Sequence, residues 1–432
     1  MTAGSNSRCR TRNIGLATFS LLNLLQALAV ASLSPRRNWT ICSKSIHEEP
    51  LPLQQEQQAC PIPSDWAPWS PRPSCVQPSH EYDSEPTDCL FTFPTFRGNQ
   101  GISLITTPHI AASIVDTLDD SRASAGLRPN HSNLRQEREN KTAAYEIRDL
   151  PGRGKGLVAK RRFARHETIM VGFPVLIVRL DFINEDRYSR RQKQTMMERS
   201  VKQLPQGQQE AVLALQRNTG GEPILDTLRT NGFGIEIGGA QHLALFTEGS
   251  RVNHNCRPNA FWRYINSKMA MEVVALRDIR PGEEIAHSYA PLGYTYAERK
   301  AVLQAWGFRC TCALCSAPRE ERELSDSRRE RILEIHQTLG QASGLRDRRV
   351  DELVLEATRL VELEELHPQL VEYYQQFAKA YLMTGNLRRA REFIAEADKM
   401  WQLYGGEEHE NVDGMRELWR ILEEVEADAL DS

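Results

Sequence analysis

Asn253-His254-Asn255-Cys256-Arg257-Pro258-Asn259 is the stretch that decides the fold of this 432-residue chain. It concentrates polar and turn-forming residues between two apolar runs. Taken alone, such a segment predicts only a polar turn. Its meaning comes from the segments that precede and follow it.

A cysteine cluster follows this stretch, in Cys310-Thr311-Cys312-Ala313-Leu314-Cys315. Three thiolates suit one metal ion, but a tetrahedral zinc site needs a fourth ligand. Cys256 is the remaining cysteine in this half of the chain. We therefore predict a structural zinc site formed by Cys256, Cys310, Cys312 and Cys315, because four thiolates leave no open position. The alternative is a group of buried free cysteines.

Short β-rich runs alternate with turns on both sides of the deciding stretch. From residue 145 onward, the pattern predicts strands around 152–156, 168–180, 233–237, 259–264, 270–275 and 284–289. Between them, 187–217 is charged and glutamine-rich, with apolar residues at helical spacing. We therefore predict a β-rich domain that carries a helical insertion at about 183–230.

These segments, in this order, resemble the SET-domain family of protein-lysine methyltransferases. Asn253 to Asn259 resembles the hallmark segment of that family, and Leu276 to Ile285 resembles the stretch before its catalytic tyrosine. Arg153-Gly154-Lys155-Gly156-Leu157 resembles the first strand and turn, where glycines let the backbone approach the cofactor. Trp306-Gly307-Phe308 precedes the cysteines, as in members with a post-SET zinc site.

The resemblance covers roughly residues 143–318 and implies a pseudo-knotted SET fold of short curved sheets. It also implies methyl transfer from S-adenosylmethionine to a lysine of a protein substrate, histone or non-histone. Tyr289, in His287-Ser288-Tyr289, is the implied catalytic residue and orients the reacting atoms without acting as the base. The residues implied to bind the cofactor are Arg153, Gly154, Lys155, Gly156, Asn231, Asn253, His254 and Phe308.

Alternatives stand beside these assignments. His254 is alternatively a structural histidine, and Phe308 a core aromatic. From another class of function, the chain is a catalytically silent SET scaffold for protein interactions, although the intact Tyr289 argues against this. Asn255 also departs from the serine that is common at this position in relatives with a helical C-terminal domain.

The chain after residue 318 is rich in Glu, Arg and Leu at helical spacing, which predicts an all-helical domain over 319–432. One helix pair has the spacing of a tetratricopeptide repeat, with Gly385-Asn386 at its turn, so a peptide partner is possible there. The SMYD branch of the family shares this tail but also carries an inserted MYND zinc finger. No cysteine lies between Leu90 and Arg251, so that finger is absent and substrate capture rests on the insertion, the helical domain or both.

The N-terminus has the layout of a secretory signal peptide over residues 1–31. Three arginines precede an apolar stretch from Ile14 to Val30, which ends in Ala29-Val30-Ala31. A membrane anchor and an unexported leader are the alternatives, although the stretch is short for a spanning helix. Cleavage would leave four cysteines, compatible with two disulfides in three connectivities: Cys42, Cys60, Cys75 and Cys89.

The complete prediction is an α+β protein. A Cys/Pro-rich region and linker over 32–142 precedes a SET domain over 143–291, a post-SET zinc-binding segment over 292–318 and the helical domain. The net charge of −3 and the pI near 6.4 argue against a broad surface for nucleic acid. The localisation is contested, because an export signal points to the secretory pathway whereas the family works mostly in the nucleus and cytoplasm. We expect no membrane span in the mature chain.

Overall fold

The computed structural model describes residues 68–70, 72–78, 87–118, 144–184, 186–342, 344–406 and 408–431. The described residues all belong to one compact unit. The predicted signal peptide, Cys42 and Cys60 therefore lie outside the described residues. Among the helices of these ranges, none combines the length and hydropathy that a membrane span requires.

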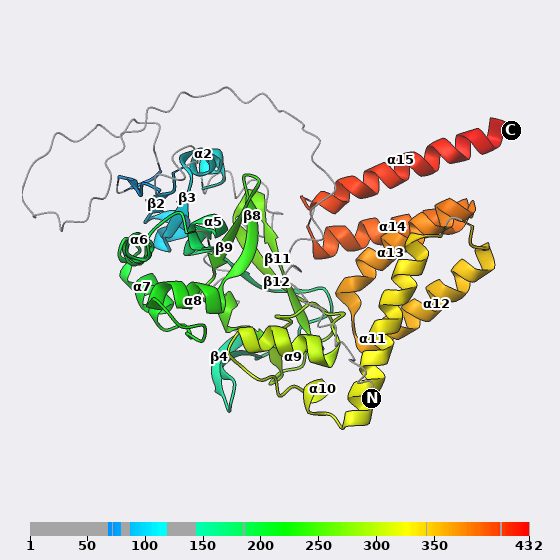
Figure 1. Cartoon of the computed structure of the whole chain (residues 1–432), viewed down its shortest axis with the longest axis horizontal. Coiled ribbons are helices and arrows are strands. Elements are labelled where there is room, and N and C mark those ends of the chain that lie inside the picture. Colours follow the sequence, from blue (N-terminus) through cyan, green and yellow to red (C-terminus); the bar gives the residue numbers. More distant parts are fainter. Residues whose placement is uncertain are drawn as a thin grey trace, which may run out of the picture. The chain divides into compact units, whose positions relative to one another are not determined.

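The largest sheet joins strands from both sides of the predicted domain boundary at residue 143. Its six strands lie in the order β1 (Ser74–Cys75), β2 (Cys89–Phe93), β3 (Ile102–Thr106), β7 (Leu176–Arg179), β9 (Ala240–Leu245) and β8 (Phe233–Ile237), as Figure 1 shows. β3 and β7 pair in parallel and are buried along their whole length, as expected for central strands. The boundary stays a prediction, but the sheet runs across it.

Three short elements complete this N-terminal part. α1 (Phe96–Asn99) lies between β2 and β3, and α2 (Pro108–Ser113) and η3 (Val115–Leu118) follow β3. Thr107 caps α2 by accepting a hydrogen bond from the backbone N–H of Ile110, and Pro108 occupies its first turn.

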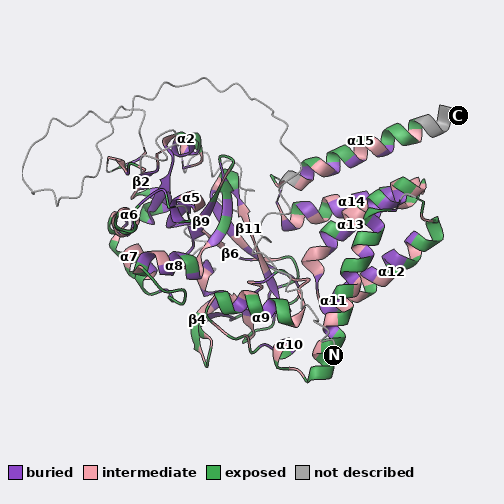
Figure 2. Ribbon diagram, in the orientation of Figure 1, coloured by how far each residue is buried: buried purple, intermediate pink, exposed green. Residues whose placement is uncertain are grey.

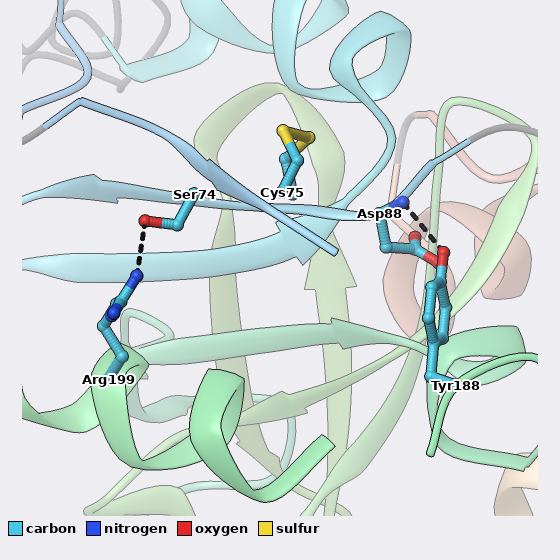
Figure 3. The surroundings of a disulfide bond; sticks show 6 residues. Ser74, Cys75, Asp88, Tyr188 and Arg199 are labelled. Atoms are coloured by element: carbon cyan, nitrogen blue, oxygen red, sulfur yellow. Dashed lines mark hydrogen bonds between the residues drawn. A yellow bond between two sulfur atoms is a disulfide. The ribbon is translucent and has the colours of Figure 1, made fainter. Parts of the chain in front are cut away.

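A disulfide and a buried ion pair hold the first two strands. Cys75 and Cys89 are direct partners across the β1–β2 pair and form the disulfide. The neighbouring Asp88 is fully buried, and its two carboxylate oxygens accept hydrogen bonds from Nε and Nη2 of Arg179, each 2.7 Å long. The Tyr188 hydroxyl donates to the same carboxylate at 2.9 Å. Figure 3 shows how the tyrosine approaches Asp88 beside the disulfide.

Two smaller sheets form the rest of the β-rich domain. One has four strands in the order β10 (Asn253–His254), β13 (Glu284–His287), β5 (Gly154–Ala159) and β4 (Tyr145–Leu150). The other has three, in the order β11 (Ala260–Ile265), β12 (Ala270–Ala275) and β6 (Thr168–Gly172). The turns η5 (Gly249–Arg251) and η6 (Asn266–Lys268) flank β10 and β11. The predicted fold of short sheets is confirmed, with the single run expected at 168–180 divided between β6 and β7.

The predicted helical insertion is present as four helices, α5 (Leu180–Asn184), α6 (Arg190–Lys202), α7 (Gln206–Leu213) and α8 (Pro223–Asn231). α6 begins at a capping box between Ser189 and Gln192, and the side chain of Glu222 caps α8. The buried face of α6 contacts β2 and β3. Arg199 of this helix also donates a 2.9 Å hydrogen bond to the Ser74 hydroxyl beside the disulfide (Figure 3).

The C-terminal part is helical, as predicted. α9 (Tyr296–Ala305) and α10 (Ala313–Ser316) precede α11 (Arg319–Gly340), α12 (Asp347–Glu364), η7 (His367–Gln369), α13 (Leu370–Thr384), α14 (Leu387–Tyr404) and α15 (Glu410–Asp431). Gly385 ends α13 with a φ of 78°, which glycine adopts readily, and Asn386 caps α14. The helix pair predicted around this turn is present, and its tetratricopeptide character stays a prediction.

Burial divides the molecule into separate cores. One lies under the three sheets, one between the large sheet and helices α5 to α8, and one within the C-terminal helices. Figure 2 shows the strands of the large sheet mostly buried, whereas α11 and α12 alternate between buried and exposed residues. A fourth, small cluster contains the four cysteines predicted to bind zinc.

Candidate active site and metal centre

The deciding stretch is locked to strand β13. β10 pairs in parallel with β13, and the backbone N–H of Asn255 donates to the carbonyl of His287 at 2.8 Å. At the other end, the buried Asn259 side chain accepts from the Ala286 N–H at 2.8 Å and donates to the Glu284 carbonyl at 2.7 Å. Both ends of the loop from Asn253 to Asn259 are therefore fixed to the strand that leads into Tyr289. We call this arrangement the clasp.

A cavity of about 330 Å³ lies between this clasp and the segment after α9. Its volume falls in the range of small-molecule and cofactor sites. The structure brings ten of the predicted site residues to its lining: Arg153, Gly154, Lys155, Asn231, Asn253, His254, Tyr289, Phe308, Cys310 and Cys312. Residues that sequence reasoning did not assign also line it: Gly152, Gln216, Asn218, Thr230, Ser250, Arg251, Trp306, Gly307, Arg309 and Thr311.

Glu284 organises one side of the cavity. Its carboxylate forms an ion pair with Arg153 at 2.6 Å and accepts a hydrogen bond from the Asn253 amide at 2.9 Å. Arg153 also donates to the His254 carbonyl at 2.7 Å. Sequence reasoning missed Glu284, because one glutamate in the run before the tyrosine carries no signal of its own.

Gly156 lies behind this carboxylate rather than in the cavity lining. A Cβ added there would lie 2.7 Å from Nδ2 of Asn253 and 3.1 Å from the Glu284 carboxylate, and it would also collide with Leu150. The glycine predicted to contact the cofactor therefore acts by letting Asn253 and Glu284 approach the β5 backbone.

Lys155 lines the cavity, but its ammonium pairs with the exposed Asp149 at 3.2 Å. This surface ion pair is weakly held, so the lysine is available to a ligand at small cost. Asn231 also lines the cavity, and its assignment to the cofactor stays a prediction. Its side-chain amide donates to the carbonyls of Gln216 and Thr227 at 2.8 and 2.7 Å, and so fixes the loop that forms one wall.

Tyr289 lies at the junction of the clasp and the cavity. Its hydroxyl donates to the Val252 carbonyl at 3.0 Å, and its backbone N–H donates to Nδ1 of His254 at 3.0 Å. Burial raises the pKa of Tyr289, so the phenol stays neutral near pH 7. Its ring has four aromatic neighbours with centroid distances of 4.9 to 5.9 Å: His254, His287, Trp306 and Phe308.

His254 connects the tyrosine to the cysteine cluster. Because Nδ1 accepts from the Tyr289 N–H, the proton of the neutral ring lies on Nε2, which is 3.2 Å from the sulfur of Cys256. Burial lowers the pKa of His254 to about 3, which keeps the ring neutral. The alternative of a structural histidine is consistent with both bonds, although the ring also lines the cavity.

The segment after α9 closes the cavity. Gly307 has a φ of 79°, and a Cβ there would lie 2.8 Å from the Asn218 carbonyl oxygen, so the turn requires glycine. Phe308 contacts the rings of His254 and Tyr289 with centroids 6.1 and 5.9 Å apart. This aromatic therefore lines the cavity instead of lying in a main core, which favours the prediction over the alternative.

The four predicted zinc ligands come together. The sulfur atoms of Cys256, Cys310, Cys312 and Cys315 all lie within 4.8 Å of one another. The Cys256 sulfur is 3.9 Å from that of Cys310 and 3.5 Å from that of Cys315. A tetrahedron with zinc–sulfur bonds of about 2.3 Å needs sulfur atoms about 3.8 Å apart, so the donor set fits zinc.

An aromatic group lies on the other side of Tyr289 from Phe308. Phe233 has its ring centroid 5.0 Å from that of Trp262 and 5.8 Å from that of His287. Nε2 of His287 and the hydroxyl of Tyr264 are buried without a hydrogen-bond partner in the described part of the chain. Burial lowers the pKa of His287 to about 4, so this imidazole is neutral as well.

Comparison with known proteins identifies the family. A profile of the SET domain matches residues 154–290. Histone-lysine N-methyltransferase set5 of Schizosaccharomyces pombe is 27% identical over 278 residues, which make up 62% of this chain and 81% of the relative. N-lysine methyltransferase SMYD2 of Homo sapiens is 37% identical over 105 residues, or 22% of this chain and 24% of the relative.

Histone-lysine N-methyltransferase SET5 of Candida albicans is 35% identical over 81 residues, which cover 18% of this chain and 17% of the relative. The chain thus spans most of the Schizosaccharomyces relative but a quarter or less of the other two. The matched SET profile contains the first strand and turn, the clasp and Tyr289. This chain therefore contains a SET domain and is similar to protein-lysine methyltransferases.

Proposed function

We propose that this protein transfers a methyl group from S-adenosylmethionine to the side-chain amine of a lysine in a protein substrate. The observation that carries the proposal is the cavity, which gathers Asn253, His254 and Tyr289 of the SET domain with Phe308 of the segment that follows it. The names of the relatives support the same reaction, on histone lysine in set5 and on protein lysine in SMYD2. The choice between a histone and another protein stays open.

The cavity lining suits this cofactor. Guanidinium, ammonium and amide groups from Arg153, Lys155 and Asn253 meet the aromatic rings of Trp306 and Phe308. Such a lining fits a ligand that has an amino-acid end and an aromatic base. When bound, the cofactor supplies an electrophilic methyl group on a sulfonium, and transfer to an amine is an in-line displacement.

The chain's contribution is to present and desolvate the lysine. At pH 7, removing the proton of a lysine with a pKa of ~10.4 costs about 4–5 kcal/mol. The aromatic group of Phe233, Trp262 and His287 offers a dry surface for the lysine stem, and desolvation lowers the cost of the neutral amine. Tyr289 orients the reacting atoms through its fixed hydroxyl, because a neutral phenol is a poor base.

Cys256, Cys310, Cys312 and Cys315 would hold a zinc ion with a structural role. Four thiolates occupy all positions of a tetrahedral ion, so it would cross-link the clasp to the segment that carries Phe308. This cross-link would hold the wall of the cofactor cavity in place. A peptide that docks on the α13 and α14 helix pair remains our proposal for how the helical domain contacts its substrate.

The test of activity is transfer of a labelled methyl group to a lysine-containing protein extract by the purified, zinc-loaded chain. Tyr289→Phe should lose at least about 100-fold in rate, because it removes the orienting hydroxyl. Tyr145→Phe is the matched control, since it removes a hydroxyl that bonds to Glu248 and does not line the cavity. If the wild-type chain transfers no labelled methyl group, the proposal is wrong and the catalytically silent scaffold is favoured.

We also propose that the protein enters the secretory pathway. The export-like segment at 1–31 and the disulfide between Cys75 and Cys89 support this, because disulfides persist in oxidising compartments. Sequencing the mature N-terminus from cells tests it, with an end near Ser32 expected. An intact Met1 together with nuclear staining of the whole protein would contradict the proposal.

A further inference from the structure

Two arginines are buried completely beside the active site. Arg299 of α9 and Arg329 of α11 are each 1% exposed, and they are the bulkiest of the fully buried side chains in the described ranges. Both guanidinium groups donate to the same backbone oxygen, that of Tyr294. Two positive charges therefore lie side by side without access to water, which is costly unless negative charge compensates them.

The hydrogen bonds of this pair are incomplete. Nε and Nη2 of Arg299, and Nη2 of Arg329, have no hydrogen-bond partner among the residues that the structure describes. Arg299 forms no ion pair with a carboxylate there either, and Arg329 forms one, with Glu364 at 3.3 Å. Buried guanidinium donors without hydrogen-bond partners indicate that a negatively charged group binds beside them.

Glu364 does not supply the missing charge. Its carboxylate is fully buried at the end of α12 and accepts from the Ser325 hydroxyl at 2.6 Å. It also pairs with Arg257 at 3.3 Å and with Arg328 at 3.2 Å, whose side chains are 32% and 28% exposed. One carboxylate is thus shared by three arginines, and the positive charge of the pair remains uncompensated.

Arg257 links the cysteine cluster to these arginines. It directly follows Cys256 in the chain and shares Glu364 with Arg329. Zinc with four thiolates carries a net charge of −2, since two positive charges meet four negative ones. That charge matches the two buried guanidinium groups.

We propose that Arg299 and Arg329 are the buried counter-charges of a zinc tetrathiolate at Cys256, Cys310, Cys312 and Cys315. The inference rests on the proposed zinc site. It assigns the helical domain a role in metal binding, because Arg329 belongs to α11. These are positioning residues, which contact neither cofactor nor substrate.

The test measures zinc affinity by competition with a chromophoric chelator, on the full chain, after the zinc content of the wild type has been established. Arg299→Met keeps an unbranched stem and removes the guanidinium charge, and it should weaken zinc binding roughly tenfold or more. Arg299→Lys should stay closer to the wild type. Arg331→Met, which breaks an exposed ion pair on α11, is the control and should change the affinity within about twofold.

Glu364→Gln separates electrostatics from structure. It removes a negative charge, so it should lower the melting temperature while leaving zinc binding as tight as in the wild type or tighter. A purely structural role predicts instead that zinc affinity falls with stability in this variant as well. A parallel loss of zinc affinity and stability in Glu364→Gln would overturn the inference. A folded Arg299→Met chain with unchanged zinc affinity would overturn it as well. If Arg299→Met does not fold, the result for Glu364→Gln alone decides between the two roles. A wild-type chain without zinc would overturn the metal site itself.

Discussion

Replacing Gly156 by alanine tests how the first turn of the SET domain serves the cofactor cavity. The added methyl group would lie 2.7 Å from Nδ2 of Asn253, about 0.7 Å inside an ordinary contact of ~3.4 Å, and 3.1 Å from the Glu284 carboxylate. Asn253 cannot retreat freely, because β10 is paired to β13. The clash would therefore distort the hydrogen bond between Asn253 and Glu284, and with it the ion pair between Glu284 and Arg153.

Overpacking of this kind costs about 1–3 kcal/mol. If the cost appears in the cavity, the dissociation constant for S-adenosylmethionine rises by a factor of about 5–150. Isothermal titration calorimetry measures the constant, and a thermal melt shows whether the fold survives. Gly234→Ala in β8 is the matched control, because a Cβ there meets nothing within 4 Å. A folded Gly156→Ala chain that binds the cofactor like the wild type would refute the reasoning.

Two further predictions concern buried polar groups in the same domain. Asn259→Ala removes the side chain that bonds to the Ala286 N–H and the Glu284 carbonyl. The free energy of unfolding, measured in urea, should therefore fall by about 2–3 kcal/mol. A fall of less than about 0.5 kcal/mol would contradict the role given to these hydrogen bonds. Burial lowers the pKa of His242 to about 4, below its value of ~6.5 in the unfolded chain. The contribution of the neutral imidazole to the free energy of unfolding is therefore complete above pH ~6.5 and is lost as the pH falls toward ~4. That loss amounts to roughly 3 kcal/mol. His242→Gln should therefore make the free energy of unfolding, measured in urea, depend less on pH between ~6.5 and ~4. An unchanged slope would show that other groups cause the pH dependence.

The catalytic half of the molecule was largely predictable because its signals are dense and local. The cysteine spacing and the hallmark stretch each involve residue types that serve few other purposes together. The fold class, the helical insertion and the convergence of the four sulfur atoms follow those predictions. The roles of single residues were harder to assign, since Gly156 acts behind the cavity wall through contacts that spacing does not reveal.

What sequence reasoning missed depends on distant pairing. β9 lies between β7 and β8 in the large sheet, but its sequence Ala-Gln-His-Leu-Ala-Leu lacks the β-branched residues that mark strands. Glu284 and Glu364 are ordinary glutamates in the sequence, and only their partners 100 or more residues away, such as Arg153 and Arg257, reveal what they do. The N-terminal strands suggested a separate region because their partner β7 lies far along the chain.

The continuity of the large sheet has a consequence for synthesis of the chain. β2 and β3 can form their hairpin as soon as they leave the ribosome, but the outer edge of β3 must wait for β7, more than 70 residues later, and β7 then waits for β9. During that interval an apolar strand edge is open to other chains. Nascent protein therefore depends on shielding by chaperones, and a chain begun at residue 144 would leave the β7 edge bare permanently. The soluble yield of such a truncated chain, relative to the full one, measures how far the N-terminal strands protect the enzyme from aggregation.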